Sequence, residues 1–539
     1  MANIDGVIEE WMASELERRP VAATGLGIGG YDGQLGDFSA RDFERQEVED
    51  RRWAARLDSL IDPGVAPDAQ IDTTLLLSEL AGSAVMQDWQ SWRRDPSVYL
   101  DACTHGLHLL FLHRLRPEAE LVAAAVSRLG QVPGVVAAAR ANLDPSIASR
   151  LLVERGCRAA RAAAAYFRDH LPGSVADQGL QADLASSAEG AAEALDALAS
   201  HLDSLSRIAR GDWRLGESRY NALLHHRELL GYGASELHAR GLVAWDALDA
   251  EMADLAARVD PGGGGWRAVI AALSAVHPGS PEQMRTAYES ACEDARSFLV
   301  QRGLVTLPDG ERCLVIPSPV FQRPLLAVAS YSQPPAFSSS RTGMFYVPYP
   351  PEGTTPEQLE QRLSDNGTHA IPTIAVHEAY PGHHWQLTWA NATTRPVRKM
   401  ISTPYFVEGW ALYAEKMMRD QGFFADPRQE LCHLDARIFR AARVVVDTAL
   451  HTGEMTVVEA VTFMSTKASL TEAVARAEVE RYCAWPTQAP SYLTGSLEIE
   501  RMQDRWRKEG RGDLRQFHDA VAAAPGMPLA LTERAVFGP

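Results

Sequence analysis

Apolar residues recur every three or four positions along most of the chain between about residues 40 and 300. Ala, Leu, Arg and Glu dominate long segments with this spacing, among them 120–130, 149–171 and 189–205. Proline and glycine fall mostly between these segments, where helices are expected to end. No repeat of fixed period is visible, which argues against a solenoid. The pattern therefore predicts a long array of packed amphipathic helices.

The pattern changes between about residues 303 and 350, where short β-prone runs alternate with prolines. Helical spacing returns at about residue 355 and continues to the end of the chain. We therefore expect a mainly α protein with two lobes, a groove between them for a ligand, and a single functional unit over 1–539. The expected parts are a helical scaffold lobe (1–300), a small β insert (301–350) and a helical lobe that carries the functional site (351–539).

The composition is ordinary for a soluble globular protein, with an acidic balance. The 539 residues are 46% hydrophobic and 23% charged, and 52 Lys and Arg stand against 70 Asp and Glu, a net charge of −18. This balance argues against nucleic acid or anionic membranes as partners. No run approaches the roughly 18 apolar residues of a membrane span, and the N-terminal segment lacks the apolar core of a signal peptide.

The six cysteines are scattered without CxxC pairs. This spacing predicts free thiols in a reducing compartment, and neither a disulfide framework nor a cysteine zinc site. We therefore expect a cytoplasmic protein.

The run HEAYPGHH at 377–384 places three histidines and a glutamate close together. Imidazoles and carboxylates are the usual ligands of catalytic zinc, which needs three protein ligands and an open position. In the common HExxH motif the two histidines lie one turn apart on one helix face. Here the position four after His377 is Pro381, so the second ligand would be His383 or His384. A helix terminus with structural histidines is the alternative.

A regular helix brings neither later histidine to a metal beside His377. His383 would point about 240° around the axis, and His384 would lie about 10 Å along it. Pro381 removes a helical hydrogen bond and crowds the preceding turn, and Gly382 adds backbone freedom. The sequence therefore predicts a break inside the motif that returns one of the two histidines to the metal.

The run HEAYPGHHWQ resembles the HExxPGHxxQ signature of a large bacterial family, domain of unknown function family 885, whose members are regarded as zincin-like metallopeptidases. Weaker matches at 219–252 and 314–350 extend the resemblance over nearly the whole chain. A departure occurs at Thr487, where many relatives carry a glycine after the proline. Three further segments match in order: FVEGWALYAE (406–415), RAARVVVDTALH (440–451) and RYCAWPTQAPSYLTG (481–495).

This resemblance implies a zincin-like body and one zinc ion per chain. It implies that His377 and His383 bind the metal, that Glu408 is the third ligand, and that Glu378 is the general base. The segment after Glu408 agrees, because its large apolar residues follow helical spacing and anchor the helix in the core. A carboxylate beside such a face has to be paired or metal-bound.

Two further groups are candidates for supporting roles. Arg443, Asp447 and His451 recur every four positions and share one helix face. Asp447 would orient a zinc-binding imidazole while its neighbours bind substrate, and a surface ion pair is the alternative. Tyr492 would donate to the oxyanion of a tetrahedral intermediate, or else be a core tyrosine.

The remaining candidates would contact substrate or support a ligand. If His383 binds the metal, His384 would take such a role, Tyr380 could face the substrate, and Gln488 could shape the pocket. Three arginines could each clamp a substrate carboxylate with two hydrogen bonds, or could simply be exposed surface residues. They are Arg323, Arg341 and Arg481.

These features favour a zinc-dependent hydrolase of peptide or small amide bonds, of cytoplasmic carboxypeptidase or oligopeptidase type. The metal would activate a water, and Glu378 would take its proton. An amide-hydrolysing tailoring enzyme of specialised metabolism is a related alternative. A non-catalytic metal-binding scaffold is an alternative of a different class, against which the intact Glu378 argues. We expect a monomer or homodimer without nucleic acid or membrane partners.

Overall fold

The computed structural model describes residues 4–61, 64–323 and 328–538, and most of them are helical. The chain divides into two compact units. Unit 1 comprises Met1–Leu215 and Pro335–Ser339, and unit 2 comprises Gly216–Pro334 and Ser340–Pro539. The main boundary thus falls at residue 215, whereas the sequence pattern placed it near residue 300. The reason is that helices between 217 and 302 pack with the C-terminal half of the chain.

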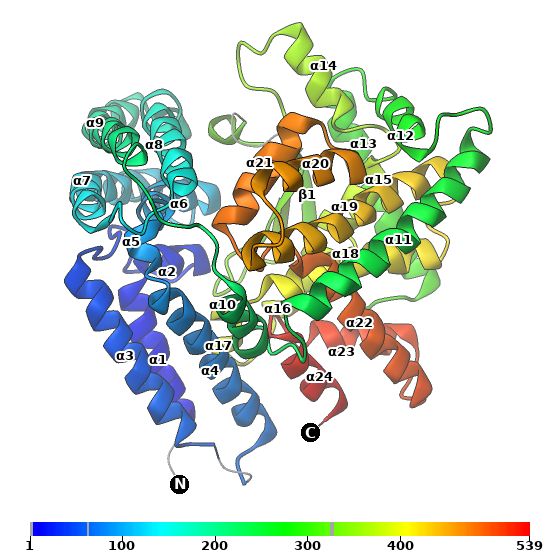
Figure 1. Ribbon diagram of the computed structural model, residues 1–539, viewed down its shortest axis with the longest axis horizontal. Helices are drawn as coiled ribbons and strands as arrows, with labels where there is room; N and C mark the ends of the chain where they lie inside the picture. Colours follow the sequence, from blue (N-terminus) through cyan, green and yellow to red (C-terminus); the bar gives the residue numbers. More distant parts are fainter. Residues whose placement is uncertain (1–3, 62–63, 324–327, 539) are drawn as a thin grey trace. The chain divides into compact units, whose positions relative to one another are not determined.

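In unit 1 the described elements are helices (Figure 1). Its longest helices pack side by side, α9 against α8 and α7, and α3 packs against α4. The helices are α1 (Ile4–Arg18), α2 (Pro20–Leu26), α3 (Ala40–Asp58), α4 (Pro67–Asp88), α5 (Ser91–Arg94), α6 (Ser97–His113), α7 (Glu118–Asn142), α8 (Arg150–Asp169), the short 3-10 helix η1 (Pro172–Ser174) and α9 (Gln178–Ser206).

One helix among the described residues, α7, is long and apolar enough to cross a membrane by length and composition. Its face toward α9 and α6 carries buried residues such as Leu129, Val132 and Val136. A helix packed within a folded unit meets the same two criteria, and α7 packs against α9 and α6 here.

Unit 2 combines helices with one small sheet. Its helices are α10 (Glu217–Ala222), the π-helix η2 (Leu223–Arg227), α11 (Ala234–Val259), α12 (Trp266–Ser274), α13 (Pro281–Arg302), the 3-10 helix η3 (Val320–Gln322), α14 (Pro356–Ser364), α15 (Ile371–Glu378), α16 (His383–Ala390), α17 (Val397–Met400), α18 (Pro404–Asp420), α19 (Pro427–Thr452), α20 (Val457–Lys467), α21 (Glu472–Ala484), α22 (Ser491–Lys508), α23 (Leu514–Ala522) and α24 (Leu529–Phe537).

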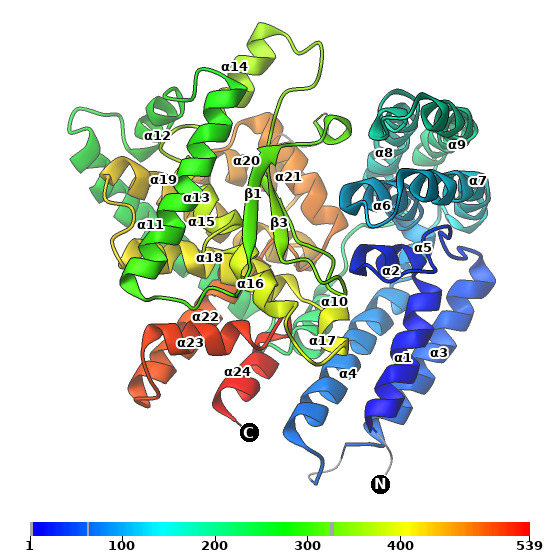
Figure 2. The same ribbon diagram turned by 180° about the vertical axis from the view of Figure 1, so that it is seen from behind.

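The sheet lies where the sequence predicts a β insert. Its strands are β1 (Arg312–Pro317), β2 (Ser330–Ser332) and β3 (Thr342–Val347), in the order β1-β3-β2. Strand β1 is parallel to β3, and β2 is antiparallel to β3 with Tyr331 opposite Phe345. Figure 2 shows β1 and β3 side by side, with α13 packed beside them. The prediction of a mainly helical protein with this insert is confirmed.

Helix α18 lies at the centre of the part of unit 2 that carries the motif. It packs against α22 and against the two motif helices, α15 and α16. Helix α22 approaches α18 so closely that a Cβ on Gly409 would lie only 2.5 Å from the Cα of Gly495. Pro404 occupies the first turn of α18, and the Thr403 side chain accepts a hydrogen bond from the Tyr405 N–H as the N-cap. The start of this helix is therefore fixed only a few residues before Glu408.

Candidate metal centre

The HEAYPGHH run contains the break that the sequence predicts. Helix α15 ends at Glu378 and α16 begins at His383. The Gly382 N–H donates to the Val376 carbonyl, and a Cβ on Gly382 would lie 1.9 Å from the His377 carbonyl oxygen. Only glycine fits so close to the preceding turn. The indole N–H of Trp410 donates to the Pro381 carbonyl at 2.8 Å, which ties the break to α18.

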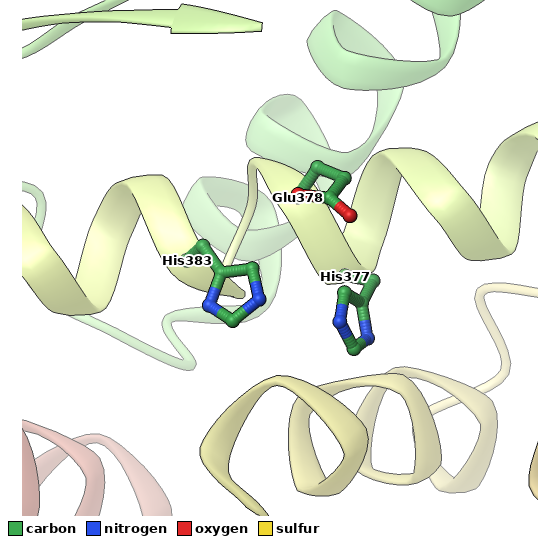
Figure 3. A group of neighbouring side chains, drawn as sticks. All are labelled: His377, Glu378 and His383. Atoms are coloured by element: carbon green, nitrogen blue, oxygen red, sulfur yellow. The ribbon is translucent and has the colours of Figure 1, made fainter. Parts of the chain in front are cut away.

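The break brings His377, Glu378 and His383 into one cluster. Possible ligand atoms of these three residues lie within 4.8 Å of one another, and Figure 3 shows the two imidazoles pointing to the same side of the chain. One Glu408 oxygen from α18 lies 3.6 Å from Nε2 of His377 and 3.4 Å from Nε2 of His383. Helices α15, α16 and α18 thus supply four acidic or imidazole groups to one point.

The spacing of these donors suits zinc. Donors about 2.1 Å from a tetrahedral zinc ion lie about 3.4 Å from one another. The distances from the Glu408 oxygen to the two imidazole nitrogens are close to that value. Two histidines and one carboxylate form a usual ligand set for catalytic zinc. The residues present therefore fit a metal ion held by His377, His383 and Glu408.

The electrostatic environment of the cluster favours a cation. Burial lowers the pKa of His377, but Glu408 and Glu415 raise it more, to about 10. Burial raises the pKa of Glu408, yet the two imidazoles hold it well below its ordinary value. Burial also raises the pKa of Glu378, and the neighbouring histidines oppose this only in part.

Glu415, which no sequence motif singled out, orients His377. Nδ1 of His377 lies 2.6 Å from a carboxylate oxygen of Glu415, which is fully buried two turns after Glu408 on α18. This contact makes Nδ1 the donor and leaves Nε2 facing Glu408 and His383. A carboxylate that accepts from the distal nitrogen of a metal-binding histidine is a common supporting group. The seven-residue spacing from Glu408 to Glu415 was the available signal, because it places both on one helix face.

His384 belongs to a different network. Its Nε2 lies 2.8 Å from a Glu311 oxygen and its Nδ1 lies 3.1 Å from the Tyr331 hydroxyl, so both nitrogens have partners. The Tyr380 hydroxyl donates to the same Glu311 oxygen at 2.6 Å. Of the two candidate histidines, the geometry therefore favours His383 as the ligand. His384 and Tyr380 instead join the motif to Glu311, which lies just before β1. No sequence pattern pointed to Glu311.

Tyr492 lies next to His377, and a chain of contacts links it to Arg443, Gln488 and Arg481. The Tyr492 ring is stacked on the His377 imidazole with centroids 6.4 Å apart, and the Arg443 guanidinium lies 4.2 Å from the Tyr492 centroid. Arg443 and Arg481 both donate to the Gln488 side-chain oxygen, at 3.3 and 2.8 Å. These four residues are among those that the sequence suggested as supporting or substrate-contacting groups.

The two other arginine candidates have backbone partners. The side chains of Arg323 and Arg341 donate to the carbonyls of Ser318 and Asp309.

The role predicted for Asp447 is wrong. Its carboxylate accepts from the Tyr220 hydroxyl at 2.6 Å and from the Thr487 N–H at 3.1 Å, whereas Glu415 is the group that contacts His377. The surface ion pair that was the alternative is also absent, because Asp447 is fully buried. His451 is buried too, and its Nε2 lies 3.0 Å from the Tyr482 carbonyl oxygen.

Thr487, the position that departs from the family pattern, has a left-handed backbone with a φ of 68°. Glycine adopts this conformation without the steric cost that a β-branched residue bears. The glycine of many relatives is thus the residue that this turn favours.

Comparison with known proteins gives a family and a fold. A family model described as a bacterial protein of unknown function (DUF885) matches residues 20–536. A search of curated proteins found no match. The chain is similar over 100% of its length to 100% of a candidate lipoprotein of unknown function from Shewanella oneidensis, at 21% identity and a TM-score of 0.82.

A second solved structure has the same fold. It is described as a candidate lipoprotein from Colwellia psychrerythraea, with 17% identity and a TM-score of 0.83 over 99% of this chain and 98% of that one. These descriptions lend no support to the expected cytoplasmic location. Because the family model covers nearly the whole sequence, the chain belongs to the DUF885 family of bacterial proteins of unknown function.

Proposed function

We propose that this protein is a zinc-dependent hydrolase of peptide or small amide bonds. The observation that carries the proposal is the single Glu408 oxygen within 3.6 Å of Nε2 of both His377 and His383, with Glu378 in the same cluster. When bound, zinc would supply Lewis-acid chemistry, polarising a carbonyl and making a water more acidic. Three protein ligands leave room for such exchangeable groups.

Glu378 is the group that would move the proton. It follows the ligand His377 directly and lies beside both imidazoles. The backbone N–H of Tyr331 on the edge strand β2 donates to its carboxylate, which limits the orientations of the side chain. A carboxylate in this position takes a proton from the attacking water and delivers it to the leaving amine.

Two further side chains would support the reaction. Glu415 fixes the imidazole of His377 by accepting from its Nδ1, so that Nε2 is presented with little loss of conformational freedom. Tyr492 lies beside His377, and its proposed role is donation from the phenol to the oxyanion that forms at the carbonyl.

The proposal is tested by measuring zinc and hydrolysis in four purified proteins. We expect about one zinc per chain in the wild type and in Glu378→Gln, with hydrolysis of short peptides falling about 100- to 10,000-fold in the variant. His383→Ala should lose zinc. His384→Asn, the matched control, should keep it because His384 contacts Glu311 and Tyr331.

Zinc retained by His383→Ala, or unchanged hydrolysis in Glu378→Gln, would contradict the mechanism. Stoichiometric zinc without hydrolysis of any peptide would favour the non-catalytic scaffold. Hydrolysis confined to non-peptide amides would favour the tailoring enzyme.

The cellular location is a separate proposal. The two solved relatives are described as candidate lipoproteins, which favours a location outside the cytoplasm for this chain as well. The six free cysteines favour the opposite. We propose the extracytoplasmic location, because it rests on relatives of the same fold. Fractionation of the native bacterium with an antibody against the protein would test it.

A further inference from the structure

Arg443 is a buried cation without a carboxylate partner. It is only 3% exposed, and no carboxylate in the described ranges forms an ion pair with it. Its Nε is buried and has no hydrogen-bond partner among the described residues. The contact of Nη2 with Gln488, at 3.3 Å, is long and involves a neutral oxygen. A buried charge is ordinarily paired, because its removal from water costs on the order of several kcal/mol.

Aromatic rings hold the guanidinium in place. It lies 4.2 Å from the Tyr492 centroid, 5.5 Å from Phe439 and 5.6 Å from Tyr482. Stacking of this kind uses the face of the guanidinium plane and leaves its N–H edge for another partner. The ring contacts therefore explain how Arg443 is positioned, and they leave its unpaired donors unexplained.

Arg440 shares the same ring. Its guanidinium lies 5.7 Å from the Tyr492 centroid, and its buried Nε also has no hydrogen-bond partner in the described part of the chain. One Nη donates to the Ala436 carbonyl at 3.0 Å, one turn earlier in α19. Two cationic side chains thus converge on Tyr492, and the Tyr492 ring is itself stacked on the imidazole of His377.

The carboxylates near Arg443 form no ion pair with it in the described part of the chain. Glu478 forms an ion pair with Arg481 at 2.8 Å and accepts from the Tyr482 hydroxyl. Asp447 accepts through Oδ2 from Tyr220 and from the Thr487 backbone, and its buried Oδ1 has no hydrogen-bond partner among the described residues. Neither carboxylate lies within ion-pair distance of Arg443, so the structure leaves a positive charge beside the metal cluster in a chain whose net charge is −18.

We propose that Arg443 and Arg440 form an anion subsite that binds a carboxylate of the substrate. The inference rests on the proposed hydrolase function and names its substrate class, a peptide or amide with a free carboxylate near the bond that is cut. The carboxylate accepts hydrogen bonds from the free guanidinium edge of Arg443, as arginine–carboxylate pairs commonly do. It belongs either to the C-terminus of the substrate or to an acidic side chain.

The test measures the binding of three peptides to the zinc-loaded Glu378→Gln protein by calorimetry. N-acetyl-alanyl-alanine has a free C-terminal carboxylate, and its C-terminal amide has none. N-acetyl-glutamyl-alanine amide has a carboxylate only on its side chain. We expect one of the two carboxylate peptides to bind about 10-fold or more tightly than the neutral amide, and the identity of that peptide tells which carboxylate the subsite reads.

Three substitutions in the same background test the residues. Arg443→Gln should weaken the binding of the preferred carboxylate peptide about 10- to 100-fold and leave the binding of the neutral amide unchanged. Arg440→Gln, at a half-buried position, should weaken the binding of the same peptide about 3- to 10-fold. If Arg443→Gln does not fold, this variant decides whether the subsite exists. Arg428→Gln is the matched control, because Arg428 lies on the same helix, is exposed and pairs with Asp426.

The subsite would be overturned if the arginine variants weakened the binding of all three peptides equally, or if the parent Glu378→Gln protein showed no preference for a carboxylate. A carboxylate preference that Arg443→Gln abolishes supports it, even if the wild type hydrolyses none of the peptides. That combination would refute the hydrolase and retain the subsite, so the two proposals fail separately.

Discussion

Glu415 and Asp447 are both fully buried carboxylates on neighbouring helices of unit 2, yet they differ in charge. Burial raises the pKa of both groups. For Glu415, the contacts with His377 and His433 outweigh this and hold the pKa at about 2. For Asp447, burial prevails and the pKa rises to about 7, because its partners are a phenol and a backbone N–H.

Glu415 and Asp447 show that the hydrogen-bonding and charged partners of a buried carboxylate decide its chemical role more than its degree of burial does. A permanently ionised Glu415 can hold an imidazole in one tautomer and strengthen it as a metal ligand. Asp447 carries a proton over much of the pH range and has a structural place between Tyr220 and the Thr487 turn. From the sequence, Asp447 was assigned to the imidazole and Glu415 was assigned no role.

The largest expected effect separates the two carboxylates by metal binding. Glu415→Gln should lower the affinity for zinc about 10- to 100-fold, because an amide oxygen accepts from His377 Nδ1 without a negative charge. Asp447→Asn should leave the affinity unchanged. Competition titration with a chelator of known zinc affinity measures both. Equal losses in the two variants would show that general damage to the fold, and not the contact with His377, sets the affinity.

The helices and the β insert were predictable from sequence because they depend on local spacing of apolar residues, prolines and β-prone runs. The break at Gly382 was predictable as well, since Pro381 excludes a regular helix whatever surrounds it. The residues that contact the motif from elsewhere in the chain were not predictable. Glu311 reaches His384 across 73 positions and Glu415 reaches His377 across 38, and such pairings follow from packing that no local pattern encodes.

The same limit explains the choice between His383 and His384. Spacing alone left both open, and what distinguishes them is where Glu408 and Glu311 lie after folding. The boundary at residue 215 was hidden for a similar reason. The helical pattern is alike on both sides of it, and only the packing of α11 against α19 assigns that helix to unit 2.

A second prediction tests the charge of Asp447 through the pH dependence of stability. Its folded pKa of about 7 lies above the ordinary value of 3.8, so between these values the folded state binds more protons than the unfolded state. The free energy of unfolding should therefore fall as the pH rises through this window, by at most about 1.4 kcal/mol per pH unit from this group. Asp447→Asn cannot titrate and should have a flatter profile.

Urea denaturation of the wild type and Asp447→Asn at several pH values between about 4 and 7 measures this difference. The amide oxygen of asparagine can accept from both Tyr220 and Thr487, because a single oxygen of Asp447 does so in the structure. Parallel profiles would mean that Asp447 is ionised in the folded protein, and the contrast with Glu415 would then lose its basis.

The smallest expected effect concerns the second partner of Glu415. Nδ1 of His433 lies 3.3 Å from Glu415 but makes no hydrogen bond by geometry, and burial lowers the pKa of His433. His377, whose Nδ1 lies 2.6 Å from Glu415, is the closer and better aligned partner. His433→Gln, which keeps a polar group of similar reach, should lower zinc affinity about threefold or less, as expected for a misaligned contact. The chelator titration used for Glu415→Gln applies. A loss as large as that of Glu415→Gln would show instead that the charge on Glu415 depends on His433, and that the chain of contacts supporting the metal cluster extends one residue further into α19.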